Sequence, residues 1–222
     1  IIELYEDKTI IRAAERDELT GLYSKEFFYE YIRQLDDFED DKEMDAIVLN
    51  IEHFHIINEM YGREVGDEIL SLVGSKLSDI LGSRPDADTF YFYVEHSEEY
   101  MKRFTDLQDE MLKHASVPHL RLRMGVYRDV DKTESIESRF DHAKLASDKI
   151  RGDYTKQIEV YSKEQNEADL YHEKLINDID AAIENKDFVV FLQPKYGVLG
   201  REPMLRSAEA LIRWKHKDLG MI

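Results

Sequence analysis

Apolar residues recur along the chain with two different periods, and these periods predict alternating helices and strands. Apolar side chains recur at the spacing of amphipathic helices in residues 25–35 and 55–81. The second of these ranges is predicted to hold two helices. Residues 44–54 open with a strongly apolar run typical of a buried strand, and residues 119–127 alternate with the two-residue period of a strand. The other elements predicted in this region are a strand at 88–96, a helix ending at Leu112, a helix at 137–152 and a strand at 158–162. Strands that alternate with helices imply an α/β fold in which helices pack on a sheet.

The pattern starts again after about Ser162. A helix is predicted at 169–185, followed by strands at 188–196 and 206–214. One helix and a strand pair do not enclose a core of their own, so this region is either the beginning of a second domain or an appendage of the first. At the other end, residues 1–15 place apolar side chains among charges, as expected for the end of an incoming helix.

Composition narrows the classes of partner. Lys and Arg number 30 against 48 Asp and Glu, and the formal net charge of −18 opposes binding to nucleic-acid backbones and anionic membrane surfaces. The chain has no cysteine, which excludes disulfides, thiolate zinc sites and cysteine nucleophiles. No apolar run approaches the roughly 20 residues that a membrane-spanning helix needs, and no signal-peptide pattern opens the chain. We therefore expect a cytoplasmic fragment, whose parent protein is free to be membrane-anchored through an upstream region.

Two local clusters invite a metal-binding interpretation. The acidic stretch at residues 36–45 lacks the turn glycine and the terminal glutamate of an EF-hand, and we interpret it as a solvated loop. His53 and His55 flank an aromatic residue but have no third ligand nearby in the sequence, so we interpret them as loop residues.

Three spaced strings carry a family resemblance. They are DELTGLYSKEFF from Asp17, LNIEHFHIINEMYGREVGDEIL from Leu49, and RFDHAKLASDKIRGD from Arg139. Together they resemble the GGDEF family, whose active members are diguanylate cyclases. The resemblance implies a ferredoxin-like sheet of the nucleotidyl-cyclase type, flanked by helices, in a domain that covers residues 16–162.

The metal-binding positions that the resemblance implies are altered here. Joining two GTP molecules requires a 3′-hydroxyl to attack an α-phosphate, and carboxylate-held divalent metal stabilises the developing charge. In active members an Asp-x-Asp pair ends the first strand, and the matching residues here are Asn50 and Glu52. Asn offers one neutral oxygen, whereas the longer Glu52 would point to the same face of the strand and compensate in part.

The signature turn is altered as well. Aligning Arg84 and Asp88 with the family's Arg-x-Gly-Gly-Asp-Glu-Phe puts Asp86 and Ala87 at the two glycines and Thr89 at the glutamate. Glycines let a backbone approach phosphate closely, whereas a carboxylate at position 86 repels it. Asp88 alone survives of the acidic pair, which leaves open at most a weak Mg²⁺ site.

Other positions match the family. Asn58 and Asp67 correspond to the residues that contact the guanine edge, a sensible pair because Asn donates and accepts while Asp accepts from the guanine N–H groups. The alternative is that both residues have only local structural roles, Asn58 as a helix cap and Asp67 as a favourable charge in the first turn of a helix. The family's phosphate-contacting lysine falls near Asp148, whose neighbours Lys149 and Arg151 we interpret as solvated helix surface.

A second resemblance covers residues 169–222. FLQPKY and AEALIRW look like the opening of an EAL domain, the cyclic-diguanylate phosphodiesterase that often follows a GGDEF domain. It implies that Glu209 is a metal ligand of a complete EAL domain, that Arg213 meets substrate phosphate, and that Gln193 belongs to the early Gln-Pro motif. We assign residues 163–222 to the truncated N-terminal part of such a domain, and Glu209 alone does not assemble its site.

The function expected from these residues is regulatory. We interpret the chain as a catalytically degenerate GGDEF domain that receives a signal through residues 1–15, senses GTP and tunes the rest of its EAL domain, with this fragment itself inactive as an enzyme. One alternative is a weak cyclase that uses Glu52 and Asp88 for metal. The other is a scaffold that forms homodimers through its aromatic strand at 89–94 and the incoming helix, and binds no nucleotide.

Overall fold

A computed structural model describes residues 15–114, 117–197 and 202–222 of the chain. The chain divides into two compact units between Ser162 and Lys163. The incoming helix predicted at residues 1–15 lies, apart from Glu15, outside the described residues.

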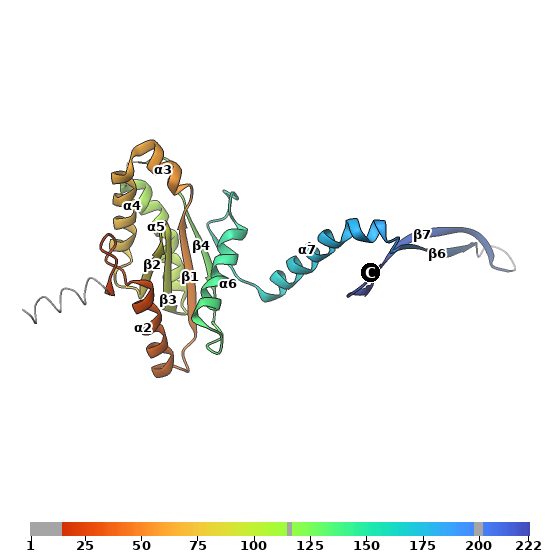
Figure 1. Ribbon diagram of the computed structural model, residues 1–222, viewed down its shortest axis with the longest axis horizontal. Coiled ribbons are helices and arrows are strands. Elements are labelled where there is room, and N and C mark those ends of the chain that lie inside the picture. The colour runs from red at the N-terminus through yellow and green to blue at the C-terminus, as the bar shows by residue number, and fades with distance from the viewer. Residues whose placement is uncertain (1–14, 115–116, 198–201) are drawn as a thin grey trace, which may run out of the picture. The chain divides into compact units, whose positions relative to one another are not determined.

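A five-stranded sheet in the order β2-β3-β1-β4-β5 forms the centre of the first unit (Figure 1). Its strands are β1 (Met44–Ile51), β2 (Gly82–Asp86), β3 (Thr89–Glu95), β4 (Leu122–Tyr127) and β5 (Ile158–Val160). The helices are α2 (Lys25–Phe38), α3 (Phe54–Tyr61), α4 (Arg63–Lys76), α5 (Glu98–His114) and α6 (Ile136–Lys149). Strand β1 is antiparallel to both of its neighbours, β3 and β4, whereas β4 and β5 run parallel. The sequence-based prediction of a mixed α/β fold with helices on a sheet is therefore confirmed.

Alternation along β1 sends its side chains into two separate cores. Ile47 and Leu49 pack in the core that α3, α4 and α5 cover, whereas Ala46 and Val48 pack in the core that α2 and α6 cover. Successive side chains of a strand point to opposite faces, so Asn50 shares the face of Ala46 and Val48. This face is the one on which the candidate site is built.

Most of the predicted elements in this unit are present, with shifted ends. The long helix predicted to Leu81 ends at Lys76, because the chain turns there to bring Gly82 beside Phe92 as strand β2. Sequence reasoning missed β2, since Pro85 and Asp86 within it are typical of a turn. Ser24 takes the predicted cap position of α2, but its side chain makes no cap hydrogen bond.

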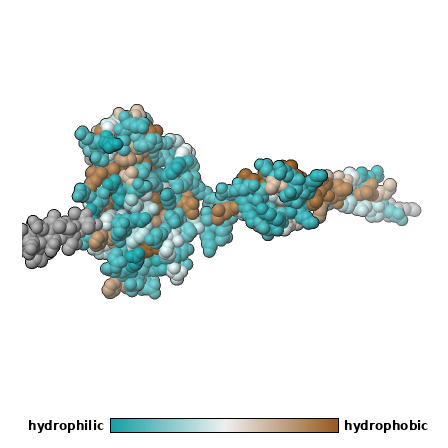
Figure 2. Space-filling view, in the orientation of Figure 1, coloured by the Kyte–Doolittle hydropathy of each residue, from teal (hydrophilic) through white to brown (hydrophobic). Residues whose placement is uncertain are grey.

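The second unit consists of α7 (Lys163–Glu184) and a sheet of β6 (Phe188–Gly197), β7 (Met204–His216) and β8 (Gly220–Met221). Trp214 and Ala182 are buried in this unit. In contrast, Val190, Phe191 and Leu192, three consecutive residues of β6, are 64%, 51% and 68% exposed. Since neighbours along a strand point to opposite sides, both faces of the hairpin leave apolar surface uncovered within this unit, and brown surface is visible there in Figure 2.

Candidate functional site

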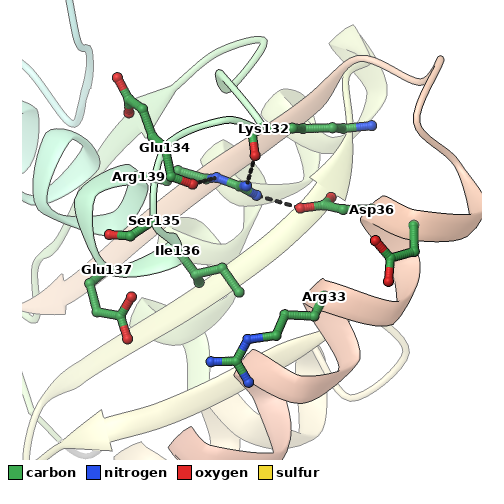
Figure 3. Close-up of a pocket in the computed structure, with 9 residues that line it drawn as sticks. Arg33, Asp36, Lys132, Glu134, Ser135, Ile136, Glu137 and Arg139 are labelled. Carbon is green, nitrogen blue, oxygen red and sulfur yellow. Dashed lines mark hydrogen bonds and ion pairs between the residues drawn. The ribbon is translucent and has the colours of Figure 1, made fainter.

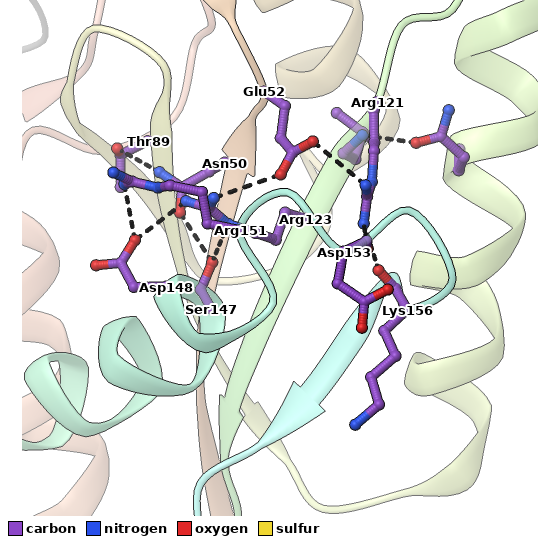
Figure 4. Close-up of polar contacts among 12 residues, drawn as sticks. Asn50, Glu52, Thr89, Arg121, Arg123, Ser147, Asp148, Arg151, Asp153 and Lys156 are labelled. Atoms are coloured by element: carbon purple, nitrogen blue, oxygen red, sulfur yellow. Dashed lines mark hydrogen bonds and ion pairs between the residues drawn. The ribbon is translucent and has the colours of Figure 1, made fainter. Parts of the chain in front are cut away.

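Three residues form a row across the first sheet, at the end where β1 finishes and β3 begins. In the strand register, Asn50 of β1 lies opposite Thr89 at the start of β3 and opposite Arg123 of β4. Ser147 of α6 meets Asn50 and Arg123, and Thr89 joins them through Asn50 (Figure 4). The sheet topology therefore joins positions that are 73 residues apart in sequence.

Hydrogen bonds run continuously through this row. The Asn50 Nδ2 atom donates to Thr89 Oγ1 at 2.8 Å, and Ser147 Oγ donates to Asn50 Oδ1 at 3.1 Å. Arg123 Nε in turn donates to Ser147 Oγ at 3.0 Å. Both polar ends of the Asn50 amide are thus used by neighbouring side chains.

Helix α6 reaches the row because position 125 of β4 is a glycine. A Cβ atom there would lie 1.9 Å from the Ala143 carbonyl oxygen and 2.3 Å from the Ser147 backbone nitrogen. Real Cβ atoms do not approach backbone so closely, so the glycine is what lets helix and strand touch. The close contact brings Ser147 and Asp148 to the row.

Glu52 lies just beyond the end of β1, between two arginines. Its Oε1 atom is 3.4 Å from the Arg123 guanidinium and its Oε2 atom is 3.4 Å from that of Arg121. The Glu52 side chain is only 5% exposed, and Oε2 forms the ion pair without a well-directed hydrogen bond. Arg121 also donates to the carbonyl oxygens of Asp153 and Lys156. The carboxylate predicted to compensate for Asn50 is therefore already neutralised by protein cations.

Asp88 lies in a two-residue turn, Ala87–Asp88, between the paired residues Asp86 and Thr89. Its carbonyl oxygen accepts a hydrogen bond from the Ile51 N–H group at 3.1 Å, which ties the turn to the end of β1. Burial raises the pKa of the Asp88 carboxyl, and the nearby Asp86 raises it further. A hydrogen bond from the residue's own backbone N–H group opposes this rise, and Arg123 and Arg151 oppose it less. Asn50, Glu52, Asp88 and Thr89 thus lie at one end of the sheet, where β1 finishes and β3 begins.

Two arginines share the carboxylate of Asp148 at the C-terminal end of α6. Asp148 Oδ1 accepts from Arg123 at 3.2 Å and from Arg151 at 2.8 Å. Burial lowers the pKa of Arg123, but a guanidinium stays protonated at any physiological pH. The row thus carries fixed positive charge, balanced by the carboxylates of Glu52 and Asp148.

A second ion pair anchors strand β2. Arg84 Nε and Nη2 reach the two carboxylate oxygens of Asp17 at 3.1 and 2.6 Å, and Arg84 also donates to the Ala87 carbonyl at 3.2 Å. Burial favours the neutral acid, but hydrogen bonds from Arg84 and Thr20 outweigh it and hold the pKa of Asp17 below its ordinary value. This pair ties the turn that holds Asp88 to the segment before α2.

Asn58 and Asp67 lie on the other side of the sheet, on α3 and α4. Asn58 is inside α3 and caps no helix, so the cap alternative is wrong; Asp67 follows the first turn of α4. The Asn58 side chain lies against Gly66, where a Cβ atom would come 2.0 Å from its Oδ1. Among the described residues, neither side chain has a hydrogen-bond or ion-pair partner, and Asp67 lines a shallow hollow along α4 together with Glu64, Glu68 and Ser71.

Sequence reasoning missed Arg121, Arg123 and Ser147. The signal was present, because two arginines two residues apart in an otherwise apolar strand must point to the same face. What the pattern did not show was that this face is buried under α6 and shared with Asn50.

The sequence model of the GGDEF family, described as "Diguanylate cyclase, GGDEF domain", matches residues 14–153. That match covers more than half of the chain. The chain belongs to the GGDEF family. GGDEF domains generally use Mg²⁺, so the donor atoms of this domain are relevant to metal binding.

Relatives of the GGDEF domain include curated proteins and solved structures. The chain is 22% identical over 222 residues to the cyclic di-GMP phosphodiesterase PdeR of Escherichia coli, an alignment that covers 94% of this chain and 33% of PdeR. The coiled coil and GGDEF domain of DgcB from Caulobacter crescentus, in complex with c-di-GMP, superposes with a TM-score of 0.62 at 16% identity, covering 71% of this chain and 92% of that one. The S helix-GGDEF-EAL structure of Vibrio cholerae LapD, bound to c-di-GMP, gives 0.53 at 16% identity and covers 100% of this chain and 54% of that one. The chain thus spans about a third of the length of the curated relative.

The donor atoms at this end of the GGDEF sheet do not fit a tightly held Mg²⁺ ion. The Asn50 amide directs its N–H group at Thr89, where a metal would need an oxygen. Glu52 is already paired with two guanidinium groups. Of the two carboxylates that the resemblance suggested as metal ligands, Asp88 is the one without an ion pair among the described residues. This end of the sheet therefore favours internal ion pairs over metal coordination.

Glu209, beyond the GGDEF domain, is on β7 opposite Gln193 and forms an exposed ion pair with Lys195 at 2.8 Å. The one potential metal-binding group among the described residues is elsewhere in this unit, at Asp178, His216 and Asp218. There His216 Nε2 meets Asp178 at 3.0 Å, while its Nδ1 lies 3.1 Å from the Asp218 N–H group. Nδ1 thus holds the turn that follows β7 and Nε2 joins β7 to α7, which explains the cluster without a metal.

A charged hollow lies between α2 and the start of α6 in the GGDEF domain (Figure 3). Arg139, buried at its wall, donates to Asp36 and to the carbonyl oxygens of Lys132 and Glu134. These bonds tie the loop before α6 to α2, and none of the predicted site residues lines the hollow.

Among the described residues, no helix is both long and apolar enough to cross a membrane.

Proposed function

We propose that residues 16–162 form a GGDEF domain that has lost cyclase chemistry, senses a guanine nucleotide and regulates an adjoining EAL phosphodiesterase. The observation that carries the loss of activity is the hydrogen bond from Asn50 to Thr89. These are the two positions where the family resemblance expects carboxylates, and here they satisfy each other. A donor amide at this place repels a cation instead of coordinating it.

Glu52 and Asp88 do not restore the chemistry. A carboxylate between two guanidinium groups is a poor ligand, because a metal ion must displace or approach those cations. Asp88 alone offers too few oxygens for the near-octahedral shell of Mg²⁺, so we expect metal binding to be weak. The exposed Asp86 adds a negative charge where triphosphate would approach.

Retained Asn58 and Asp67 support nucleotide sensing. Neither side chain has a partner among the described residues, and together they supply the donor and acceptors that match a guanine edge. Leaving both groups unused in the free protein is the state expected of residues that await a ligand.

The link to an EAL domain rests on different observations. PdeR is named a phosphodiesterase, and the LapD structure, which covers the whole chain, contains an EAL domain. The apolar side chains exposed on both faces of β6 and β7 are what a hairpin that belongs to a larger domain would present. We infer that residues 163–222 belong to that EAL domain, with Glu209 as one of its metal ligands.

The test measures product and binding separately. The protein is incubated with GTP and Mg²⁺ or Mn²⁺ and assayed for cyclic di-GMP by mass spectrometry, and its melting temperature is recorded with GTP, GDP, ATP and cyclic di-GMP. We expect no cyclic di-GMP to form. We expect GTP and GDP to raise the melting temperature and ATP to leave it unchanged. Asp67→Asn should abolish this rise, whereas Glu68→Gln, a change at a neighbouring exposed acid in the same hollow, should leave it intact.

Other outcomes lead to other functions. Cyclic di-GMP formation that disappears in Asp88→Ala would establish the weak cyclase instead. A melting temperature unchanged by every nucleotide would exclude sensing and favour the dimerisation scaffold, for which light scattering measures the oligomeric state.

A further inference from the structure

Arg123 is a cation built into the interior of the site. Its side chain is 4% exposed, and its guanidinium contacts the Glu52 carboxylate at 3.4 Å and the Asp148 carboxylate at 3.2 Å. A guanidinium does not lose its proton, and it is held here by the Ser147 hydroxyl as well. Two carboxylates that converge on one buried site thus already share a permanent positive charge.

The position of Arg123 matters as much as its charge. It is the cross-strand neighbour of Asn50, which is in turn the neighbour of Thr89, so its guanidinium shares the row with the two altered positions. Glu52, whose Oε1 atom meets Arg123, has a second buried oxygen, Oε2, that lies 3.4 Å from Arg121 without a directed hydrogen bond. An under-used buried carboxylate oxygen is the type of group that a bound cation would satisfy.

We propose that Arg123 takes the place of the divalent cation in this domain, so that the site is charge-balanced without metal. The carboxylates of Glu52 and Asp148 are ion-paired with three guanidinium groups, those of Arg121, Arg123 and Arg151. Arg123 and Arg151 also act on the Asp88 carboxyl. Two consequences follow. The first is that removing the Arg123 charge uncovers a site for a divalent cation. The second, which rests on the proposed function, is that the wild-type domain binds guanine nucleotide without needing Mg²⁺.

Mn²⁺ alone is the probe for the first consequence, with the fraction bound read from the loss of its free-ion paramagnetic resonance signal. We expect Arg123→Met, which keeps the length of the side chain and removes its charge, to bind Mn²⁺ at least about tenfold more tightly than the wild type. The double variant Arg123→Met, Glu52→Gln should lose this gain, because the ligand is then missing. Arg139→Met removes a buried guanidinium from the other end of the sheet and should gain nothing.

The result that would overturn the proposal is equal Mn²⁺ affinity in the wild type and Arg123→Met. If Arg123→Met is unfolded in metal-free buffer, added Mn²⁺ should restore its circular dichroism, and failure to restore it also counts against the proposal. The second consequence is tested by the melting temperature of the wild type with GTP, in EDTA and in Mg²⁺. A GTP-induced rise that requires Mg²⁺ contradicts the inference, whereas no rise under either condition refutes nucleotide sensing and leaves the Mn²⁺ comparison to decide.

Discussion

Replacing Gly125 by alanine is the sharpest test of how the site is assembled. The added methyl carbon would lie 1.9 Å from the Ala143 carbonyl oxygen and 2.3 Å from the Ser147 nitrogen. Normal non-bonded contacts are longer than 3 Å, so α6 and β4 must separate by about 1 Å. Both clashing atoms belong to helix backbone, and no side-chain rotation relieves them.

The expected cost is large for so small a change. Overpacking a rigid contact costs about 1–3 kcal/mol, and the absence of a movable atom places this variant near 3 kcal/mol. For a protein of this size that corresponds to a melting temperature lowered by roughly 6–12 °C. The displaced helix also withdraws Ser147 and Asp148 from the row, which loosens the partners of Asn50 and Arg123.

Thermal unfolding, monitored by circular dichroism and by fluorescence, measures this cost separately for the two units. The single tryptophan, Trp214, is in the second unit, so its fluorescence transition should stay unchanged while the first unit melts earlier. Gly66→Ala is the matched control, because there the close atom is the end of the movable Asn58 side chain and the helix gains up to about 1 kcal/mol from alanine. A Gly125→Ala variant that melts within about 2 °C of the wild type would refute the reasoning, since one such shift is worth less than about 1 kcal/mol.

Three further outcomes follow from the geometry. Gly66→Ala should keep its stability within about 1 kcal/mol of the wild type and yet lose the GTP-induced rise in melting temperature, because the methyl group displaces Asn58; a preserved rise would separate Asn58 from nucleotide binding. Asp88→Asn should raise the melting temperature at pH 7: burial lifts the folded pKa of Asp88 above its unfolded value, so its favourable contribution is complete below about pH 4 and lost as pH rises through the folded pKa. The gain should vanish in melts below about pH 4, and a gain independent of pH would contradict this cause. Asp17→Asn should cost about 1–2 kcal/mol at neutral pH by breaking the ion pair with Arg84. Because the folded pKa of Asp17 is lowered, that difference should be complete above about pH 4 and shrink as pH falls through the folded pKa, which denaturant titrations at several pH values measure.

Much of the fold was predictable because it depends on local patterns. Period-two and period-three-to-four spacing of apolar residues located β1, β4, α2 and α6, and the spaced strings around Asp17 and Leu49 led to the GGDEF family. Strand β2 escaped prediction, since it is held by pairing with β3 and by the Arg84–Asp17 ion pair and not by strand-forming residues.

The candidate site divides in the same way. The sequence by itself determined which residue types stand at positions 50, 52, 88 and 89. With the family resemblance, these residue types led to the prediction that metal-binding carboxylates are depleted there. Only the tertiary structure decided that Arg123 enters the same row, that Glu52 lies between two guanidinium groups, and that Ser147 completes the hydrogen bonds of Asn50. These contacts depend on the register between β1 and β4 and on the close approach of α6 at Gly125, which are set by packing between segments far apart in the chain and leave no local signature.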